Sequence, residues 1–249
     1  MSIESSADWD GLRAVSRVAT QTLELLVRAT EPGITTRDLD ALAARFFASC
    51  GARSAPAMVY GFPGSVLVSV NEEVVHGVPG PRVLAAGDLV SLDVTVELDG
   101  YVADAARSVV LGHGRDTASR LAGCAKDAFD AGLSVATAGV RVNEVGRAIG
   151  HEVHRQGFTV VKGLAGHGVG RTIHEPPSIP NEWDPHQTDV LTEGLVITIE
   201  PMVTTGKGYP IEEADGWTIR TRDRRLAAHH EDTIVITNGR PIVLTQGAA

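Results

Sequence analysis

Asp93 stands in the middle of an apolar run that has the composition of a buried β-strand. Burying an isolated carboxylate costs several kcal/mol unless the group is paired or binds a cation. The alternating runs 88–98 and 101–111 predict two strands, and Asp99-Gly100 between them is a strong signal for a two-residue hairpin turn. The sequence therefore places an acid inside a hairpin, where it needs a partner.

A second aspartate lies close to it in this hairpin. In the register that the turn sets, Asp104 lies opposite Thr95, so Asp93 and Asp104 are diagonal neighbours on one face, with Cα atoms roughly 7–8 Å apart. Arg107 is expected on the opposite face, because adjacent residues of a strand point to opposite sides. Two carboxylates this close need a cation between them or a raised pKa, so we favour a metal site over a salt bridge.

Two further acids stand at the ends of apolar strands. Glu200 ends the run LVITI, and Glu231 directly precedes TIVIT. His167 adds an imidazole from GHGVG, where we expect a glycine-lined turn. Any one of these acids alone is more simply a paired structural side chain, but all of them together favour a metal site. Such a set suits Mn, Fe(II), Co or Zn, and it has enough carboxylates to bridge two ions.

The surrounding elements predict one α+β domain over residues 1–249. Amphipathic helices are expected over 8–29, 35–50, 116–137 and 142–157. The second of them begins with a weak capping box of Thr35 and Asp38. A strand is expected over 65–76, and strands and loops follow from 158 onward. GDLVSLDV at 87–94 is echoed by EGLVITIEP at 193–201, which indicates either chance or a duplication that places two strands and two carboxylates around one centre.

The composition limits the classes of partner. The chain has 249 residues, 43% of them hydrophobic, and a net charge of −9, which argues against nucleic-acid or anionic-membrane binding. The polar N-terminus has no apolar signal core and no run spans a membrane, so we expect a cytoplasmic protein. Cys50 and Cys124 fall in different predicted helices and are expected to be small buried residues in a reducing compartment.

Several motifs resemble a known family. LDVTVELDGYVAD, AGHGVGRTIHEPP, TIEPMV and EDTIVIT closely resemble the metal-site motifs of type I methionine aminopeptidases, which belong to metallopeptidase family M24; NEEVVHG and DGWTIRTRD resemble that family's substrate-site segments. The resemblance covers nearly the whole chain. It implies the pita-bread fold, a pseudo-twofold antiparallel sheet core with helices packed on its outer face. Type I is favoured over type II because no long insertion separates the motifs and no zinc-finger extension precedes them.

The resemblance implies a dinuclear centre of two divalent ions (Co, Mn, Fe(II) or Zn). Its five ligands would be Asp93, Asp104, His167, Glu200 and Glu231. Asp104 and Glu231 would bridge the ions, Asp93 would chelate one, and His167 with Glu200 would hold the other. A hydroxide between the ions would attack the first peptide bond, with Glu200 as general base and then acid.

The resemblance also implies the residues that hold the substrate. His174 would donate a hydrogen bond to the carbonyl oxygen or the tetrahedral intermediate, and His76 would contact the scissile amide or the substrate backbone. A metal and acids would hold the free α-amine, which explains exopeptidase action. The methionine pocket would be walled by Tyr60, Phe62, Leu67, Ile173 and Trp217.

The pocket segment departs from the family pattern at four positions. Tyr60 stands where a histidine is usual, Gly64 replaces a lysine, and Leu67 and Val75 stand where cysteines often do. A change of one methylene in an apolar pocket shifts discrimination by roughly 1–3 kcal/mol, so these departures bear on substrate range rather than on metal chemistry.

Three other polar residues near the motifs match no ligand position. His229 and His230 adjoin Glu231 and are expected in a loop or at a rim, and Glu175 is expected to be a turn acid.

The leading hypothesis is an aminopeptidase that removes the initiator methionine from nascent chains when the second residue is small. It would act as a cytoplasmic monomer with transient ribosome contact and no nucleic-acid or membrane partner. One alternative is an Xaa-Pro aminopeptidase or dipeptidase on the same fold, but those relatives usually carry an extra N-terminal domain, for which too few residues precede Asp93. The other alternative is a non-catalytic binding protein with the pita-bread fold, and the complete set of five metal ligands argues against it.

Overall fold

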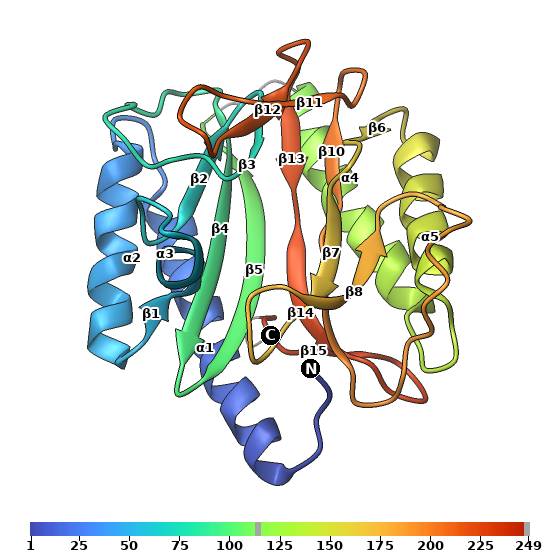
Figure 1. Cartoon of the computed structure of the whole chain (residues 1–249). Helices are drawn as coiled ribbons and strands as arrows, with labels where there is room; N and C mark the ends of the chain where they lie inside the picture. The colour runs from blue at the N-terminus through green and yellow to red at the C-terminus, as the bar shows by residue number, and fades with distance from the viewer. Residues whose placement is uncertain (113–115, 247–249) are drawn as a thin grey trace.

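The computed structural model describes residues 1–112 and 116–246, and a nine-stranded antiparallel sheet forms its centre (Figure 1). Seven strands lie side by side in the order β1 (Arg53–Ser54), β4 (Leu89–Leu98), β5 (Tyr101–Val110), β14 (Glu231–Val235), β9 (Val196–Ile199), β7 (Ala165–Gly168) and β8 (Glu175–Pro180). Two more strands join this path, β2 (Leu67–Val70) beside β4 and β15 (Ile242–Val243) beside β14.

Two small three-stranded sheets lie at one end of the large one (Figure 1). The first consists of β13 (Ala227–His229), β10 (Met202–Thr204) and β6 (Thr159–Val160). The second consists of β11 (Pro210–Glu212), β12 (Ile219–Thr221) and β3 (Glu73–Val75).

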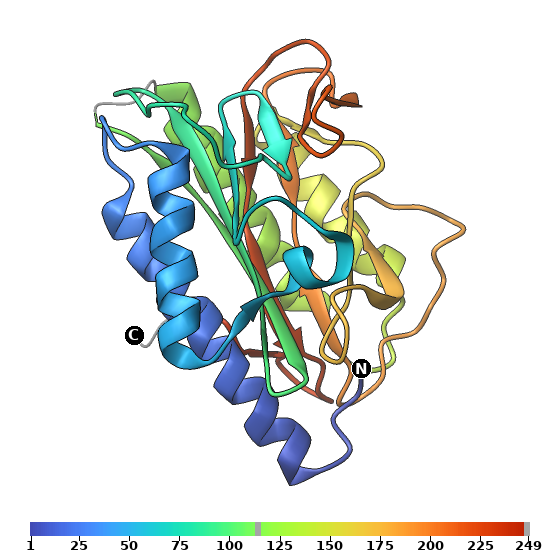
Figure 2. The same ribbon diagram turned by 60° about the vertical axis from the view of Figure 1, so that its left-hand side comes forward.

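Four long helices cover the outer face of the large sheet in two pairs (Figures 1 and 2). These helices are α1 (Ser6–Ala29), α2 (Thr36–Cys50), α4 (Asp116–Val135) and α5 (Val142–Arg155). The first pair packs with β4 and β5 in one apolar cluster, and the second pair packs with β9 and β14 in another. The helices thus leave the opposite, inner face of the sheet for other contacts.

The strand order is symmetric about the central pair β5 and β14. On one side the neighbour is β4 and on the other it is β9, and each half has its own pair of helices. The segments 87–94 and 193–201, which echo each other in sequence, lead into these two equivalent strands. This arrangement confirms the predicted α+β, pita-bread fold.

The predicted hairpin is confirmed residue by residue. Asp99 and Gly100 both have positive φ, 51° and 80°, as a type I′ turn requires. Leu98 pairs with Tyr101, and Thr95 pairs with Asp104, which is the register that the turn predicts. The sequence therefore sets which residues of β4 and β5 share a face.

Other elements differ from the expectation. The single strand expected over 65–76 is two strands, β2 and β3, because the chain turns at Asn71, whose φ is 62°. The short helix α3 (Ala55–Tyr60) was not expected. Cys124 is buried as predicted, but the prediction is wrong for Cys50, which is half-buried at the end of α2.

The remaining helix predictions hold. The capping box of Thr35 and Asp38 opens α2, and Gly51 ends it in the left-handed conformation. No helix among the described residues is both long and apolar enough to cross a membrane. A single domain over 1–249 stays a prediction, and its residues 113–115 and 247–249 lie outside the described part of the chain.

Candidate metal centre

Four carboxylates converge on the inner face at the middle of the large sheet. Asp93 lies on β4, Asp104 on β5, Glu200 directly after β9, and Glu231 at the start of β14. Each residue is less than a tenth exposed, and all four line one cavity of about 90 Å³. The two halves of the molecule thus contribute two acids each.

Burial raises the pKa of all four carboxyl groups. The pKa of Asp104 rises to about 6, and that of Glu200 to about 8, where the charge of Asp104 adds to the effect of burial. The pKa values of Asp93 and Glu231 lie well above their ordinary range because of burial and the neighbouring carboxylates. Within the part of the chain that the structure describes, one oxygen of Asp93 and one of Glu231 have no hydrogen-bond partner. Such a cluster fits a bound cation.

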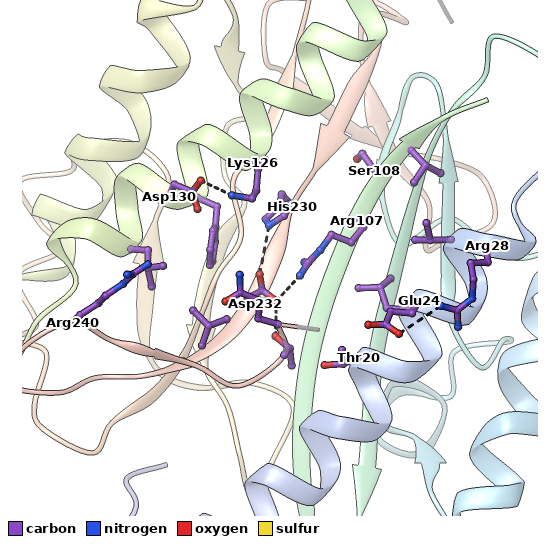
Figure 3. Close-up of a pocket in the computed structure, with 18 residues that line it drawn as sticks. Thr20, Glu24, Arg28, Arg107, Ser108, Lys126, Asp130, His230, Asp232 and Arg240 are labelled. Carbon is purple, nitrogen blue, oxygen red and sulfur yellow. Dashed lines mark hydrogen bonds and ion pairs between the residues drawn. The ribbon is translucent and has the colours of Figure 1, made fainter. Parts of the chain in front are cut away.

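Basic side chains do not supply that cation. Within residues 1–112 and 116–246, no Lys or Arg forms an ion pair with any of the four acids. Arg107 points to the outer face, as predicted, where it pairs with Asp232 at 2.8 Å (Figure 3). It also donates to the carbonyl oxygen of Glu231 at 2.6 Å. The carboxylates therefore face one another without a protein countercharge.

His167 brings an imidazole to the cluster from β7. Its Nδ1 lies 2.9 Å from the carbonyl oxygen of Gly168, which can only accept, so Nδ1 carries the proton and Nε2 keeps its lone pair. Nε2 lies 3.6 Å from Glu200 and 3.9 Å from Asp104. Burial lowers the pKa of His167 to about 4, so the ring is neutral at pH 7 and suited to binding a metal.

The expectation that His167 lies in a glycine-lined turn is wrong, because the residue lies on a strand. Its glycine neighbours serve close packing instead. A Cβ on Gly166 would lie 2.6 Å from the carbonyl oxygen of Thr198, and one on Gly168 would lie 2.3 Å from that of Pro176. The glycines therefore allow β7 to fit tightly between β9 and β8.

Ligand-type atoms form two overlapping groups around the cavity. Asp104, His167 and Glu231 form one, and Asp93, His229 and Glu231 form the other, with the atoms of each group within 4.8 Å of one another. Both groups contain Glu231, which is the arrangement that a bridging carboxylate requires. The oxygen and imidazole donors fit divalent transition-metal ions.

The expectation that His229 and His230 lie in a loop or at a rim is wrong. Both are buried, His229 at the end of β13 and His230 directly before β14. The missed signal is the period of two: His229 stands two residues before Glu231 in an extended segment and therefore shares its face. His230 points the other way, to the outer face (Figure 3).

His76 and His174 line the same cavity as the carboxylates. Burial lowers the pKa of His76 to about 4 and also lowers the pKa of His174. The Nδ1 atom of His174 lies 2.6 Å from the hydroxyl of Tyr60, and its ring lies 4.3 Å from that of His167, centroid to centroid. Both histidines thus present neutral imidazoles beside the acids.

The residues predicted to wall the methionine pocket also meet at this cavity. Phe62 and Trp217 pack edge to face with centroids 5.3 Å apart, while Tyr60 is 48% exposed and lies at the mouth. All five predicted wall residues lie in this lining: Tyr60, Phe62, Leu67, Ile173 and Trp217. The lining residues to which the sequence assigned no site role are Pro56, Thr95 and His229.

The segment that carries His174 is held by Glu175. This acid accepts the backbone N–H groups of Arg171 and Thr172 at 2.7 and 2.8 Å and pairs with the amino group of Met1. Glu175 itself is the first residue of β8, so the expectation of a turn residue is wrong, although its side chain accepts from the segment just before it.

Comparison with known proteins matches residues 10–238 to the model of metallopeptidase family M24. This chain belongs to that family. Among its M24 relatives, methionine aminopeptidase 2 of Bacillus subtilis is 42% identical over 248 residues, 99% of this chain and 100% of the relative. The crystal structure of methionine aminopeptidase from Rickettsia prowazekii covers 99% of this chain and 100% of its own, with a TM-score of 0.94 and 35% identity.

Membership in M24 confirms the resemblance drawn from the motifs and identifies the chain as a metal-dependent hydrolase. The prolidase from Pyrococcus furiosus shares the fold at a TM-score of 0.80, but it is only 21% identical, and this chain covers 66% of its length. The comparisons therefore favour the aminopeptidase hypothesis over the Xaa-Pro alternative.

Proposed function

We propose that this chain is a methionine aminopeptidase that works with two divalent ions. The observation that carries the proposal is a cluster of four buried carboxylates and His167 at a small cavity with apolar walls, where no described Lys or Arg pairs with the acids. The ligands of the two ions would be Asp93, Asp104, His167, Glu200 and Glu231. Cobalt, manganese, iron(II) and zinc all accept such donors.

When bound, the ions supply Lewis acidity and lower the pKa of water, which makes a nucleophile available at neutral pH. Glu200 is the proposed general base and acid. Its carboxylate lies 3.3 Å from the Thr198 hydroxyl and 3.6 Å from Nε2 of His167, and it faces the cavity. From there it can take a proton from the attacking water and return it to the leaving amine.

The neutral histidines are proposed to bind the peptide bond. In the tautomer of His174 that donates from Nε2, its Nδ1 accepts the hydroxyl hydrogen of Tyr60, so the tyrosine orients the donor. Nε2 would then donate to the carbonyl oxygen as negative charge develops there. His76 would contact the scissile amide from the other wall.

The cavity supports a preference for chain ends that begin with methionine. Its volume of about 90 Å³ leaves room for one side chain rather than for a continuous polypeptide. Leu67 and Val75, which depart from the family pattern, line this cavity with aliphatic groups and so keep it apolar, whereas Gly64 is not part of the lining. The substrates would be new chains whose second residue is small.

We extend the proposal to the cellular setting. Since initiator methionines arise on new chains, the enzyme would act in the cytoplasm, as a monomer in transient contact with the ribosome. The net charge of −9 argues against nucleic acid or an anionic membrane as a partner.

A peptide panel tests the proposed function. The metal-free protein is incubated with Met-Ala-Ser and with an Xaa-Pro peptide, and cobalt, manganese, iron(II) or zinc is added in turn. Release of methionine that depends on the ion supports the proposal, and the Glu200→Gln variant serves as the folded, inactive control. Preference for the Xaa-Pro peptide would favour the alternative, and no hydrolysis with any ion would refute both.

A further inference from the structure

His229 lines the cavity, but it has no role in the proposed set of five metal ligands. Its side chain is 2% exposed and lies in the same cavity as the four acids. Neither of its ring nitrogens has a hydrogen-bond partner among the described residues. Because leaving two buried polar atoms unpaired is costly, an imidazole in this position needs a partner that the polypeptide does not supply.

The backbone of His229 is held in place from the neighbouring strand. Its N–H donates to the hydroxyl of Ser108 at 2.8 Å, and the same hydroxyl donates to its carbonyl oxygen at 2.9 Å. On the other side, His229 pairs with Met202 in the sheet of β13 and β10. The ring is therefore presented to the inner face by a fixed backbone.

The ring is at a distance from two acids that suits a shared ion. Nε2 of His229 lies 3.5 Å from a carboxylate oxygen of Glu231. One ring nitrogen of His229, one oxygen of Asp93 and one oxygen of Glu231 lie within 4.8 Å of one another. Ligands about 2.1 Å from one tetrahedral ion are about 3.4 Å apart. One oxygen of Asp93 and one of Glu231 also have no hydrogen-bond partner among the described residues.

We propose that His229 is a sixth metal ligand, which gives a nitrogen to the ion held by Asp93 and Glu231. This inference rests on the proposed function in that it requires bound ions. Each ion then has one imidazole, from His167 on one side and from His229 on the other, with Glu231 between them. A nitrogen ligand on both ions favours iron(II), cobalt or zinc over manganese at both positions.

The first test counts imidazoles in the wild-type protein and needs no variant. The protein is loaded with two equivalents of cobalt(II), and X-ray absorption and a crystal structure with anomalous data are recorded. We expect two imidazoles for two ions, with a nitrogen of His229 about 2.0–2.1 Å from one of them. One imidazole for two ions, from His167 alone, would overturn the inference and leave the proposed function standing.

The second test uses a matched pair of variants, His229→Gln and His230→Gln, with cobalt binding followed by calorimetry and by visible absorption. Loss of an outer-shell partner already weakens metal binding about 10–100-fold, so we expect His229→Gln to weaken one binding step about 100-fold and to change the spectrum of one ion. His230→Gln should leave both steps and the spectrum as in the wild type. Equal behaviour of the two variants would contradict the inference, and a wild-type protein that binds no ion would refute the proposed function as well.

Discussion

Two neighbouring pairs of residues, His229 with Glu231 and His230 with Asp232, have the same chemistry and face opposite sides of the sheet. Glu231 is 1% exposed and Asp232 is 2% exposed, so burial does not distinguish them. Their partners do. Asp232 accepts hydrogen bonds from Arg107 at 2.8 Å and from the Thr245 hydroxyl at 2.7 Å, whereas one oxygen of Glu231 has no hydrogen-bond partner in residues 1–112 and 116–246.

The pKa values follow this difference. Burial alone would raise the pKa of Asp232, but the hydrogen bond from His230 and the charge of Arg107 bring it below its ordinary value. Burial and neighbouring carboxylates raise the pKa of Glu231 well above its own. A buried acid with partners is part of the structure, and a buried acid without them indicates a ligand site.

The outer side is a groove of about 540 Å³ between α1 and α4, with Asp232 in its floor (Figure 3). The other two acids in its lining also have basic partners, since Glu24 pairs with Arg28 and Asp130 pairs with Lys126. Each of the three acids in the lining of this groove thus has a basic partner, whereas the four acids of the inner face lie together.

The largest difference is expected when Glu231 is changed to Gln. Because this side chain belongs to both groups of ligand atoms, its loss should lower the rate of methionine release by roughly 10³-fold or more. The metal-free protein should unfold at the same temperature as the wild type or a higher one, since one of four repelling acids is gone. Peptide turnover and thermal unfolding with a chelator check both parts. A variant with near wild-type turnover would remove Glu231 from the proposed centre.

The matching change on the outer face, Asp232→Asn, should act on stability first. It leaves Arg107 without its counterion, which costs about 3 kcal/mol, at the low end of the range for a broken buried pair because Arg107 is 24% exposed. Urea unfolding of the metal-free protein measures the loss. The double variant with Arg107→Met should recover part of it, because the unpaired charge is removed. A loss below about 1 kcal/mol would show that the outer pair matters little.

The two faces should also respond to pH with opposite signs in the metal-free protein. The pKa of Glu200 is raised from 4.5 to about 8, so the folded state keeps a proton that the unfolded state releases. The contribution of this proton to stability is complete below pH 4.5 and is lost as the pH rises through 8. The loss between pH 6 and pH 8 is about 2 kcal/mol. The pKa of Asp232 is lowered, so its contribution to stability is present above pH 3.8, its ordinary pKa, and this contribution is lost as the pH falls through the lowered pKa.

Urea unfolding at several pH values, with a chelator, checks this dependence. We expect the free energy of unfolding to fall from pH 6 to 8 in the wild type and to fall less in Glu200→Gln. Saturating metal ions should remove the decline, because they replace the protons. A decline from pH 6 to 8 that is as large in Glu200→Gln as in the wild type would contradict the assignment of Glu200 to a group that is protonated in the folded state, because the buried neutral histidines are common to both proteins.

The sequence predicted which residues of the β4–β5 hairpin lie on the inner face, but not all of the residues that meet at the centre of that face. The turn at Asp99-Gly100 and the period of two were sufficient to place Asp93 and Asp104 together, because both lie in one hairpin. The pairing of β5 with β14 joins residues more than a hundred positions apart, for example Ala106 with Glu231, and no turn sets that register. The sequence analysis therefore places His229 in a loop or at a rim, although His229 stands only two residues before Glu231.

The short elements were hidden for a related reason. Helix α3 has six residues, too few for an apolar period to show, and only its boundary residues mark it: Ser54 at the N-cap, Pro56 in the first turn and Gly61 at the C-cap. The break between β2 and β3 depends on Asn71 in a left-handed conformation, which asparagine tolerates but does not require. Local signals thus predict long helices and tight hairpins, and tertiary contacts decide the rest.

The smallest expected effects come from one hydroxyl on each face of the sheet. Thr95 donates to Asp104 at 2.8 Å, and Thr245 donates to Asp232 at 2.7 Å while it accepts the N–H of Thr233 at 3.0 Å. Thr245→Val should therefore cost about 1–2 kcal/mol of stability and leave metal affinity unchanged.

Thr95→Val should weaken metal binding about 10-fold and leave stability nearly unchanged, because the hydroxyl orients the ligand Asp104. Calorimetry with cobalt and urea unfolding with a chelator, applied to both variants, separate the two effects. The comparison fails if both variants lose stability alike with metal affinity unchanged, because Thr95 would then be structural in the same sense as Thr245. If the effects separate, the function of a buried hydroxyl in this sheet depends on whether the acid beside it already has a partner.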